Sequence, residues 1–128
     1  MDKLDTGMIR IAPERDQYLL FTLYSDGEVT SDDLSLIRKY LVRFCGKVPL
    51  LVLRESLYSF SPEALQAMMM EAEAMVRAVA YVDRSSQDRL LSEYAKSTYL
   101  RNIPVKSFMS LEEAEEWVGQ YGPLPSRR

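Results

Sequence analysis

Residues 48–65, VPLLVLRESLYSFSPEAL, decide the fold class. The stretch begins with a continuous apolar run, which is typical of a strand that is covered on both faces. Ser61 then precedes Pro62 and Glu63, and these are favoured residue types at the N-cap, the first position and the first turn of a helix. An apolar strand, a polar turn and a helix start together indicate the repeating unit of parallel α/β proteins.

The same unit recurs downstream. VRAVAYV at residues 76–82 predicts a second strand, and the pattern over 83–100 predicts a helix whose inward residues are Leu91, Tyr94, Ala95 and Thr98. IPVKSF at 103–108 predicts a third strand, which is followed by a helix with Ser110 as its N-cap. Because a helix-length connection precedes these strands, we expect parallel pairing with right-handed crossovers.

The N-terminal third predicts a different arrangement. MIRIA at 8–12 and YLLFTLY at 18–24 are β-prone and separated by polar residues, so we expect an antiparallel hairpin. Apolar spacings of three and four over 31–45 predict a helix with Ser31 as its N-cap and with Cys45 on its buried side. The predicted fold is therefore an α/β fold with a mixed five-stranded sheet, built from a hairpin followed by βα units, and about four helices.

The composition fits one globular domain. Of the 128 residues, 47% are hydrophobic and 27% are charged. We expect an N-terminal arm at 1–7, a single domain at 8–121 and a flexible tail at 122–128. No apolar run approaches the roughly 18 residues of a membrane span, and the first residues lack the pattern of a secretory signal, so we expect a cytoplasmic protein.

The residue types exclude several functions. The chain contains no histidine, which rules out a Ser-His-Asp triad, a Cys-His pair and a histidine-ligated zinc ion. Neither glycine-rich phosphate-binding motif occurs, and the adjacent glutamates diverge along helices instead of converging on a substrate. The net charge of −3 argues against binding a nucleic-acid duplex. We therefore expect no enzymatic activity, no cofactor and no metal site.

The order of several segments resembles that of a known family. These segments are the hairpin, GEVTSDDL at 27–34, SFSPEAL at 59–65, the stretch 76–95 and VKSFMSLEEAEEWV at 105–118. Together they resemble small bacterial STAS-like (SpoIIAA-like) proteins from about residue 8 to 119. The resemblance implies a mixed sheet surrounded by helices, and action by protein contact or ligand sensing.

The resemblance also implies a candidate phosphoacceptor. Regulatory members of the family carry an Asp-Ser-Ser-Gly motif at a helix start, and a partner kinase phosphorylates its serine. The corresponding residues here are Phe60-Ser61-Pro62-Glu63-Ala64, which lack the acidic residue, the second serine and the glycine. Ser61 is the nearest candidate for the phosphorylated residue.

Polar residues follow two predicted neighbouring strands. The carboxyl ends of parallel strands meet at one edge of a sheet, and open α/β sheets bind ligands there. We therefore predict a binding rim formed by Arg54, Glu55, Ser59, Ser61, Asp83, Arg84 and Ser85. The alternative is that Ser61 and either Ser85 or Ser86 are helix caps, and that the charged residues form exposed ion pairs of little energetic value.

Two functional hypotheses follow. The leading one is a non-enzymatic regulatory domain that associates with itself as a homodimer, or with a regulatory protein partner, through the rim. It predicts an exposed apolar patch. The alternative is a carrier or sensor of a small apolar, lipid-like ligand, which the resemblance supports because some members of the broader group resemble lipid-binding domains. That alternative predicts an enclosed apolar cavity beside the helix at 61–76.

Overall fold

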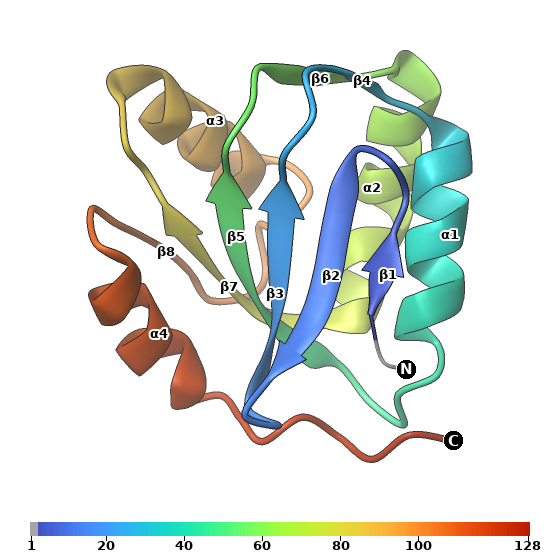
Figure 1. Cartoon of the computed structure of the whole chain (residues 1–128), viewed down its shortest axis with the longest axis vertical. Helices are drawn as coiled ribbons and strands as arrows, with labels where there is room; N and C mark the ends of the chain where they lie inside the picture. Colours follow the sequence, from blue (N-terminus) through green and yellow to red (C-terminus); the bar gives the residue numbers. More distant parts are fainter. Residues whose placement is uncertain (1–2) are drawn as a thin grey trace.

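The computed structural model describes residues 3–128, which form a mixed sheet with helices on both faces (Figure 1). The main sheet has six strands in the order β1-β2-β3-β5-β7-β8: β1 (Leu4–Asp5), β2 (Ile9–Glu14), β3 (Tyr18–Leu23), β5 (Val48–Arg54), β7 (Val76–Val82) and β8 (Val105–Phe108). Two further strands, β4 (Gly27–Val29) and β6 (Tyr58–Phe60), form a separate parallel ribbon. The helices are α1 (Ser31–Leu41), α2 (Pro62–Met75), α3 (Ser86–Ser97) and α4 (Leu111–Gly119).

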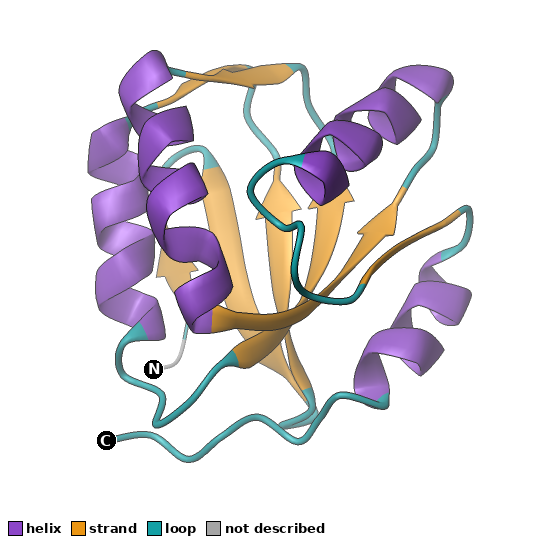
Figure 2. Cartoon of the chain, turned by 180° about the vertical axis from the view of Figure 1, so that it is seen from behind, coloured by secondary structure: helices purple, strands orange, loops and turns teal. Residues whose placement is uncertain are grey.

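The strand directions follow from the connections. Strands β1, β2 and β3 are antiparallel neighbours joined by tight turns, whereas β3, β5, β7 and β8 are parallel and joined through helices. Helices α1, α2 and α3 lie on one face of the sheet, and Figure 2 shows them in front of it. Helix α4 packs on the opposite face against β5 and β7. The mixed sheet and the four helices confirm the fold expected from the sequence.

The main sheet has six strands, so the expectation of five was wrong by one. The additional strand is β1, in which Leu4 pairs with Ile11 and Asp5 with Arg10. These two residues lie in the segment that we expected to be an N-terminal arm. A two-residue strand is too short to produce a periodic hydrophobic pattern, and the ribbon of β4 and β6 escapes detection for the same reason.

The central strands are apolar because each supplies both faces of the sheet. Successive residues of a strand point to opposite sides. In β5, Leu50 and Val52 join the core under α1, α2 and α3, whereas Leu51 joins the core under α4. The same alternation separates Val79 from Ala80 in β7.

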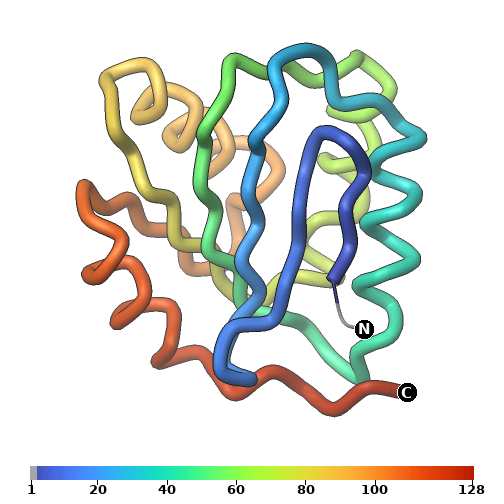
Figure 3. Tube along the Cα trace, in the orientation of Figure 1, coloured from blue at the N-terminus to red at the C-terminus, as the bar shows by residue number. Residues whose placement is uncertain are grey.

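Helix α1 differs in its bounds from the sequence prediction. Its N-cap is Thr30 instead of Ser31, since the Thr30 hydroxyl and the Asp33 carboxylate form a reciprocal capping box. The helix ends at Leu41, and the thiol of Cys45 is exposed instead of buried. After the helix, the Cys45 N–H donates to the Ser126 carbonyl at 2.7 Å. Figure 3 shows the C-terminal segment running below the lower ends of the strands.

Among residues 3–128, no helix combines the length and the apolar character that crossing a membrane requires.

Candidate functional site

The ends of β5 and β7 bring together two of the residues predicted for the rim. These strands pair in parallel with Leu53 opposite Val82, so Arg54 and Asp83 follow at neighbouring positions. Arg54 Nη1 lies 3.2 Å from Asp83 Oδ1. Ser92 of α3 donates its hydroxyl to the same Asp83 oxygen at 2.7 Å, and Arg54 Nη1 contacts Ser92 Oγ at 2.9 Å.

This ion pair is buried, in contrast to the exposed pairs that the alternative interpretation predicted. Only 2% of the Arg54 side chain and 8% of the Asp83 side chain are exposed. Arg54 Nε donates to the Tyr58 hydroxyl at 2.8 Å, and the guanidinium lies 4.4 Å from the centre of the Tyr81 ring. Burial lowers the pKa of Arg54, but the Tyr58 phenol and the Asp83 carboxylate outweigh burial and leave that pKa raised.

Asp83 is incompletely satisfied by its neighbours. Its Oδ1 atom accepts both polar contacts, whereas its Oδ2 atom is buried and has no hydrogen-bond partner in the described part of the chain. The carboxylate therefore depends on Arg54 for its charge compensation, because a buried ion without a partner is strongly destabilising.

The other residues of the predicted rim separate into exposed side chains and helix caps. Glu55, Ser59 and Arg84 are exposed. Ser61 is buried and caps α2, where its Oγ accepts the Ala64 N–H at 3.1 Å. Ser85 is exposed and caps α3 in the same way through the Asp88 N–H. Phosphorylation of Ser61 stays a prediction, and it requires the burial and the cap of this hydroxyl to be broken.

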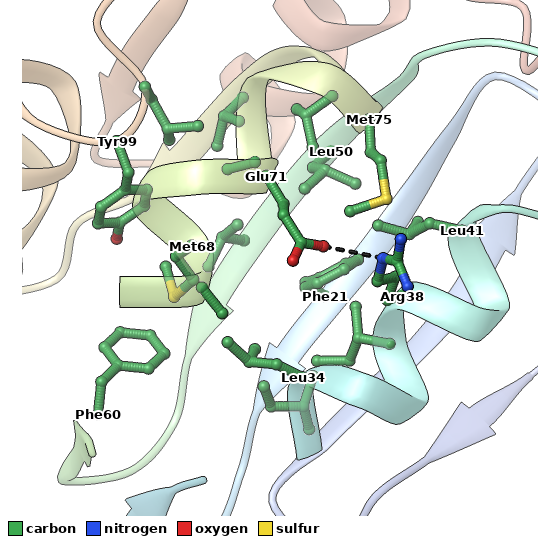
Figure 4. A pocket seen from close by; sticks show the side chains of 18 of the residues that line it. Phe21, Leu34, Arg38, Leu41, Leu50, Phe60, Met68, Glu71, Met75 and Tyr99 are labelled. Atoms are coloured by element: carbon green, nitrogen blue, oxygen red, sulfur yellow. Dashed lines mark ion pairs between the residues drawn. The ribbon is translucent and has the colours of Figure 1, made fainter. Parts of the chain in front are cut away.

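An apolar cavity of about 150 Å³ lies behind the rim, between the sheet and helices α1 and α2 (Figure 4). Its walls come from the sheet, α1 and α2, and include Phe21, Leu50, Val52, Val79, Leu34, Ile37, Leu41, Met68, Ala72 and Met75. Arg38 of α1 and Glu71 of α2 also line the cavity and form an ion pair of 2.9 Å. Because 64% of the Arg38 side chain and 44% of the Glu71 side chain are exposed, this pair marks where the cavity approaches solvent.

One end of the cavity is polar because three phenols meet there. Tyr58, Tyr81 and Tyr99 all line it. The Arg54 guanidinium contacts the Tyr58 hydroxyl and the Tyr81 ring. The Tyr81 and Tyr99 phenols are close enough to shift each other's pKa. Burial raises the pKa of the Tyr99 phenol to about 12 and that of Tyr81 well above its usual value. The phenols are therefore neutral hydrogen-bond donors at physiological pH.

Sequence reasoning missed the part of this arrangement that comes from α3 and its C-terminal turn. We expected Leu91 and Tyr94 to face inward, but they are 36% and 45% exposed, and Ser92 is buried instead. A serine is an uncommon choice for a buried helix position, and the nearby pair of Arg54 and Asp83 explains it. The sequence does contain one signal: Arg54 ends an otherwise apolar strand, and a buried arginine needs polar partners such as Ser92 from a neighbouring element.

The described residues contain no cluster of three or more histidine, cysteine or acidic side chains that could hold a metal ion. What the site offers is a buried ion pair, a row of phenols and an apolar cavity. These groups can bind and orient a small molecule through apolar contact and hydrogen bonds.

The mixed sheet and the order of its elements give an α/β fold of the SpoIIAA-like kind. A solved structure with this fold, an uncharacterized protein of the DUF3478 family from Shewanella loihica PV-4, is similar to the chain with a TM-score of 0.62. The two share 18% sequence identity over 86% of this chain and 91% of that chain, so the likeness concerns the fold. No family model and no curated protein matches the sequence.

Proposed function

We propose that this domain binds a small apolar molecule in the cavity between the sheet and helices α1 and α2, as a carrier or sensor and without catalysis. The observation that carries the proposal is the cavity itself, about 150 Å³ in volume and lined almost entirely by apolar side chains. Protein interiors are normally close-packed, and an apolar cavity of this size is large enough to hold a benzene-sized molecule.

The residues around the cavity support an exchangeable occupant. Met68 and Met75 supply flexible thioethers that adapt to irregular shapes. Helix α2 has 14 residues, and Ala64 is the only one of them that is fully buried. The helix is therefore weakly anchored to the core for its length. A helix with few buried anchors can shift at low cost when a ligand enters.

A titration with α-methylstyrene, observed by two-dimensional NMR, tests the proposal. Ala72 lines the cavity, whereas Ala74 of the same helix is exposed and does not. We expect binding to the natural chain and to Ala74→Leu, and loss of binding in Ala72→Leu, because the leucine fills the cavity. If the natural chain binds neither α-methylstyrene nor benzene, or if Ala72→Leu binds as well as Ala74→Leu, the proposal is wrong.

Native mass spectrometry of protein purified gently from a bacterial host complements this titration. A retained small-molecule mass that disappears in Ala72→Leu would identify a physiological occupant of the cavity. Retention by Ala72→Leu would place the molecule elsewhere and contradict the proposed site.

Self-association at the rim is a second candidate function. It is favoured by a groove beside Arg54 in which Leu57 and Leu91 are 73% and 36% exposed. Exposed leucines at the edge of a polar groove are typical of a protein contact surface. The same groove contains Glu55 and Arg84, which supply charges of both signs for pairing with a second copy of the chain.

Sedimentation equilibrium tests the second candidate. We expect a dimer that Leu57→Asp dissociates, whereas Leu36→Asp leaves it intact, since Leu36 is exposed on α1 and lies outside the groove. A monomer at all concentrations would contradict the homodimer. Equal effects of the two substitutions would show that the dimer does not form through this groove.

A further inference from the structure

We propose that the phenolic end of the cavity selects ligands whose apolar body carries a neutral carbonyl oxygen, such as a ketone or an ester. This inference rests on the proposed function, because it specifies the chemical class that the same cavity accepts. Its basis is the hydrogen-bonding state of Tyr58 and Tyr99.

Both phenols have an unused hydrogen. The Tyr58 oxygen accepts from Arg54 Nε at 2.8 Å, and a positively charged donor cannot accept the Tyr58 hydrogen in return. The Tyr99 phenol lines the same cavity beside Tyr81. Within residues 3–128, neither the Tyr58 nor the Tyr99 hydroxyl is the donor of a hydrogen bond. A ligand oxygen at this end would therefore satisfy donors that the protein leaves unpaired.

The two donors belong to the same end of the cavity. Tyr58, Tyr81 and Tyr99 all line it, and the Arg54 guanidinium contacts both the Tyr58 hydroxyl and the Tyr81 ring. Figure 4 shows the Tyr99 hydroxyl directed toward the side of the pocket on which Met68 and Phe60 lie. Apart from the ion pair of Arg38 and Glu71, the rest of the lining is apolar, so a ligand with one oxygen at this end and hydrocarbon elsewhere matches the cavity along its length.

The charges near the cavity favour a neutral oxygen over a carboxylate. Two cations stand close to the cavity, and each already has an anionic partner: Arg54 pairs with Asp83, and Arg38 pairs with Glu71. A carboxylate that entered would lose its hydration without gaining a free counter-charge, which is costly in a buried site. A carbonyl oxygen accepts the same hydrogen bonds at a much smaller desolvation cost.

Three probes of similar shape test this selectivity: acetophenone, α-methylstyrene and benzoate. Acetophenone and α-methylstyrene differ only in a carbonyl oxygen against a methylene group, and benzoate carries a negative charge. From dissociation constants measured by NMR titration, we expect acetophenone to bind about tenfold more tightly than α-methylstyrene, and benzoate to bind most weakly.

Variants that lack one hydroxyl assign the effect to its source. In Tyr99→Phe we expect acetophenone to lose most of its advantage while α-methylstyrene binds as before. Tyr94→Phe is the matched control, because Tyr94 is exposed on α3 and does not line the cavity. Tyr58→Phe is a second test, and it also removes the acceptor of Arg54 Nε, so Tyr99→Phe gives the cleaner result.

The outcomes separate this inference from the proposed function. Equal affinities for acetophenone and α-methylstyrene, with no change in Tyr99→Phe, would overturn the carbonyl selectivity and leave apolar binding in place. Tighter binding of benzoate than of acetophenone would overturn the preference for a neutral group. Failure of both uncharged probes to bind would overturn the proposed function, and this inference with it.

Discussion

The two faces of the sheet are built from the same strands and packed in different ways. On the α4 face, Ala80, Ala114 and Val118 are fully buried and the helix lies close against β5 and β7. On the opposite face, α1 and α2 leave a cavity of about 150 Å³ above Val79 and Leu50. Since alternate residues of one strand serve both faces, the difference arises in the helices.

Small side chains account for the close packing of α4. Ala114 and Ala80 belong to the same core cluster, and small side chains let a helix backbone approach a sheet closely. Tyr18 of β3 adds a hydrogen bond of 2.8 Å to Glu115 of α4. Helix α2 instead presents methionines and a single fully buried alanine. The two faces therefore differ in packing: small side chains close the α4 face, whereas the face under α1 and α2 contains the cavity.

The largest expected effect comes from the buried ion pair, which lies on the cavity side. Arg54→Met leaves the buried Asp83 carboxylate without its counter-charge, and we expect it to cost about 3–5 kcal/mol in the free energy of unfolding. Arg15→Met is the comparison on the other face, where Arg15 lies 3.8 Å from Glu115 and is largely exposed. That substitution should cost less than about 1 kcal/mol.

Urea unfolding of both variants and of Arg54→Met/Asp83→Leu measures the difference. The double variant should recover much of the loss, because removing both charges removes the unpaired buried ion. A single Arg54→Met variant as stable as the natural chain would contradict the role assigned to the pair.

The second prediction concerns the volume on each face. Ala114→Leu adds atoms to a region without space, and we expect it to cost about 1–3 kcal/mol through overpacking. Ala72→Leu adds the same atoms beside the cavity, where we expect a change of less than about 1 kcal/mol in either direction. Urea unfolding compares the two. Equal costs would show that the cavity is unable to accept a side chain.

The sequence predicted the central strands and the starts of two helices correctly. The apolar runs at 48–54 and 76–82 indicate strands covered on both sides, and the structure confirms both. Ser61, Pro62 and Ser110 also predicted the starts of α2 and α4 correctly. These features depend on local chemistry, which the residue types reveal directly.

Features that depend on residues distant in the sequence could not be predicted from the sequence alone. Arg54 and Asp83 were placed on one rim, but their burial depends on Ser92 and Tyr58, which arrive from other elements. The inward phase of α3 was misjudged because a polar residue, Ser92, occupies the buried position. The cavity itself follows from the distance between α2 and the sheet, which no periodic pattern encodes.

The third prediction is a loss of stability at high pH from the phenols that line the cavity. The pKa of Tyr99 rises from 10.0 to about 12 on folding because the phenol is buried. Between these two pH values the unfolded chain loses the proton that the folded chain keeps, so stability is full below pH 10 and falls as the pH rises. The slope from this phenol is about 1.4 kcal/mol per pH unit.

Urea unfolding at several pH values from 9 to 12, in the natural chain and in Tyr99→Phe, measures this slope. In Tyr99→Phe, the free energy of unfolding should fall less steeply with pH, by the slope that one proton contributes. The other buried phenols should account for the remaining decline. The pKa of Tyr18 is also raised, first by burial and then by Glu115, so Tyr18→Phe gives the corresponding measurement on the α4 face. An unchanged slope in Tyr99→Phe would show that this phenol is exposed to solvent in the folded protein.

The smallest expected effect compares the N-caps of the helices that cover the two faces. Ser61 caps α2 and Ser110 caps α4, each by accepting one backbone N–H at 3.1 Å, so replacement by alanine should cost about 1 kcal/mol in both cases. The two variants should differ in ligand binding, because only Ser61 belongs to a helix that lines the cavity. We expect Ser61→Ala to weaken α-methylstyrene binding in an NMR titration and Ser110→Ala to leave it unchanged. Equal effects on binding would mean that α4 also controls the cavity, and the difference in packing between the two faces would then not determine ligand binding.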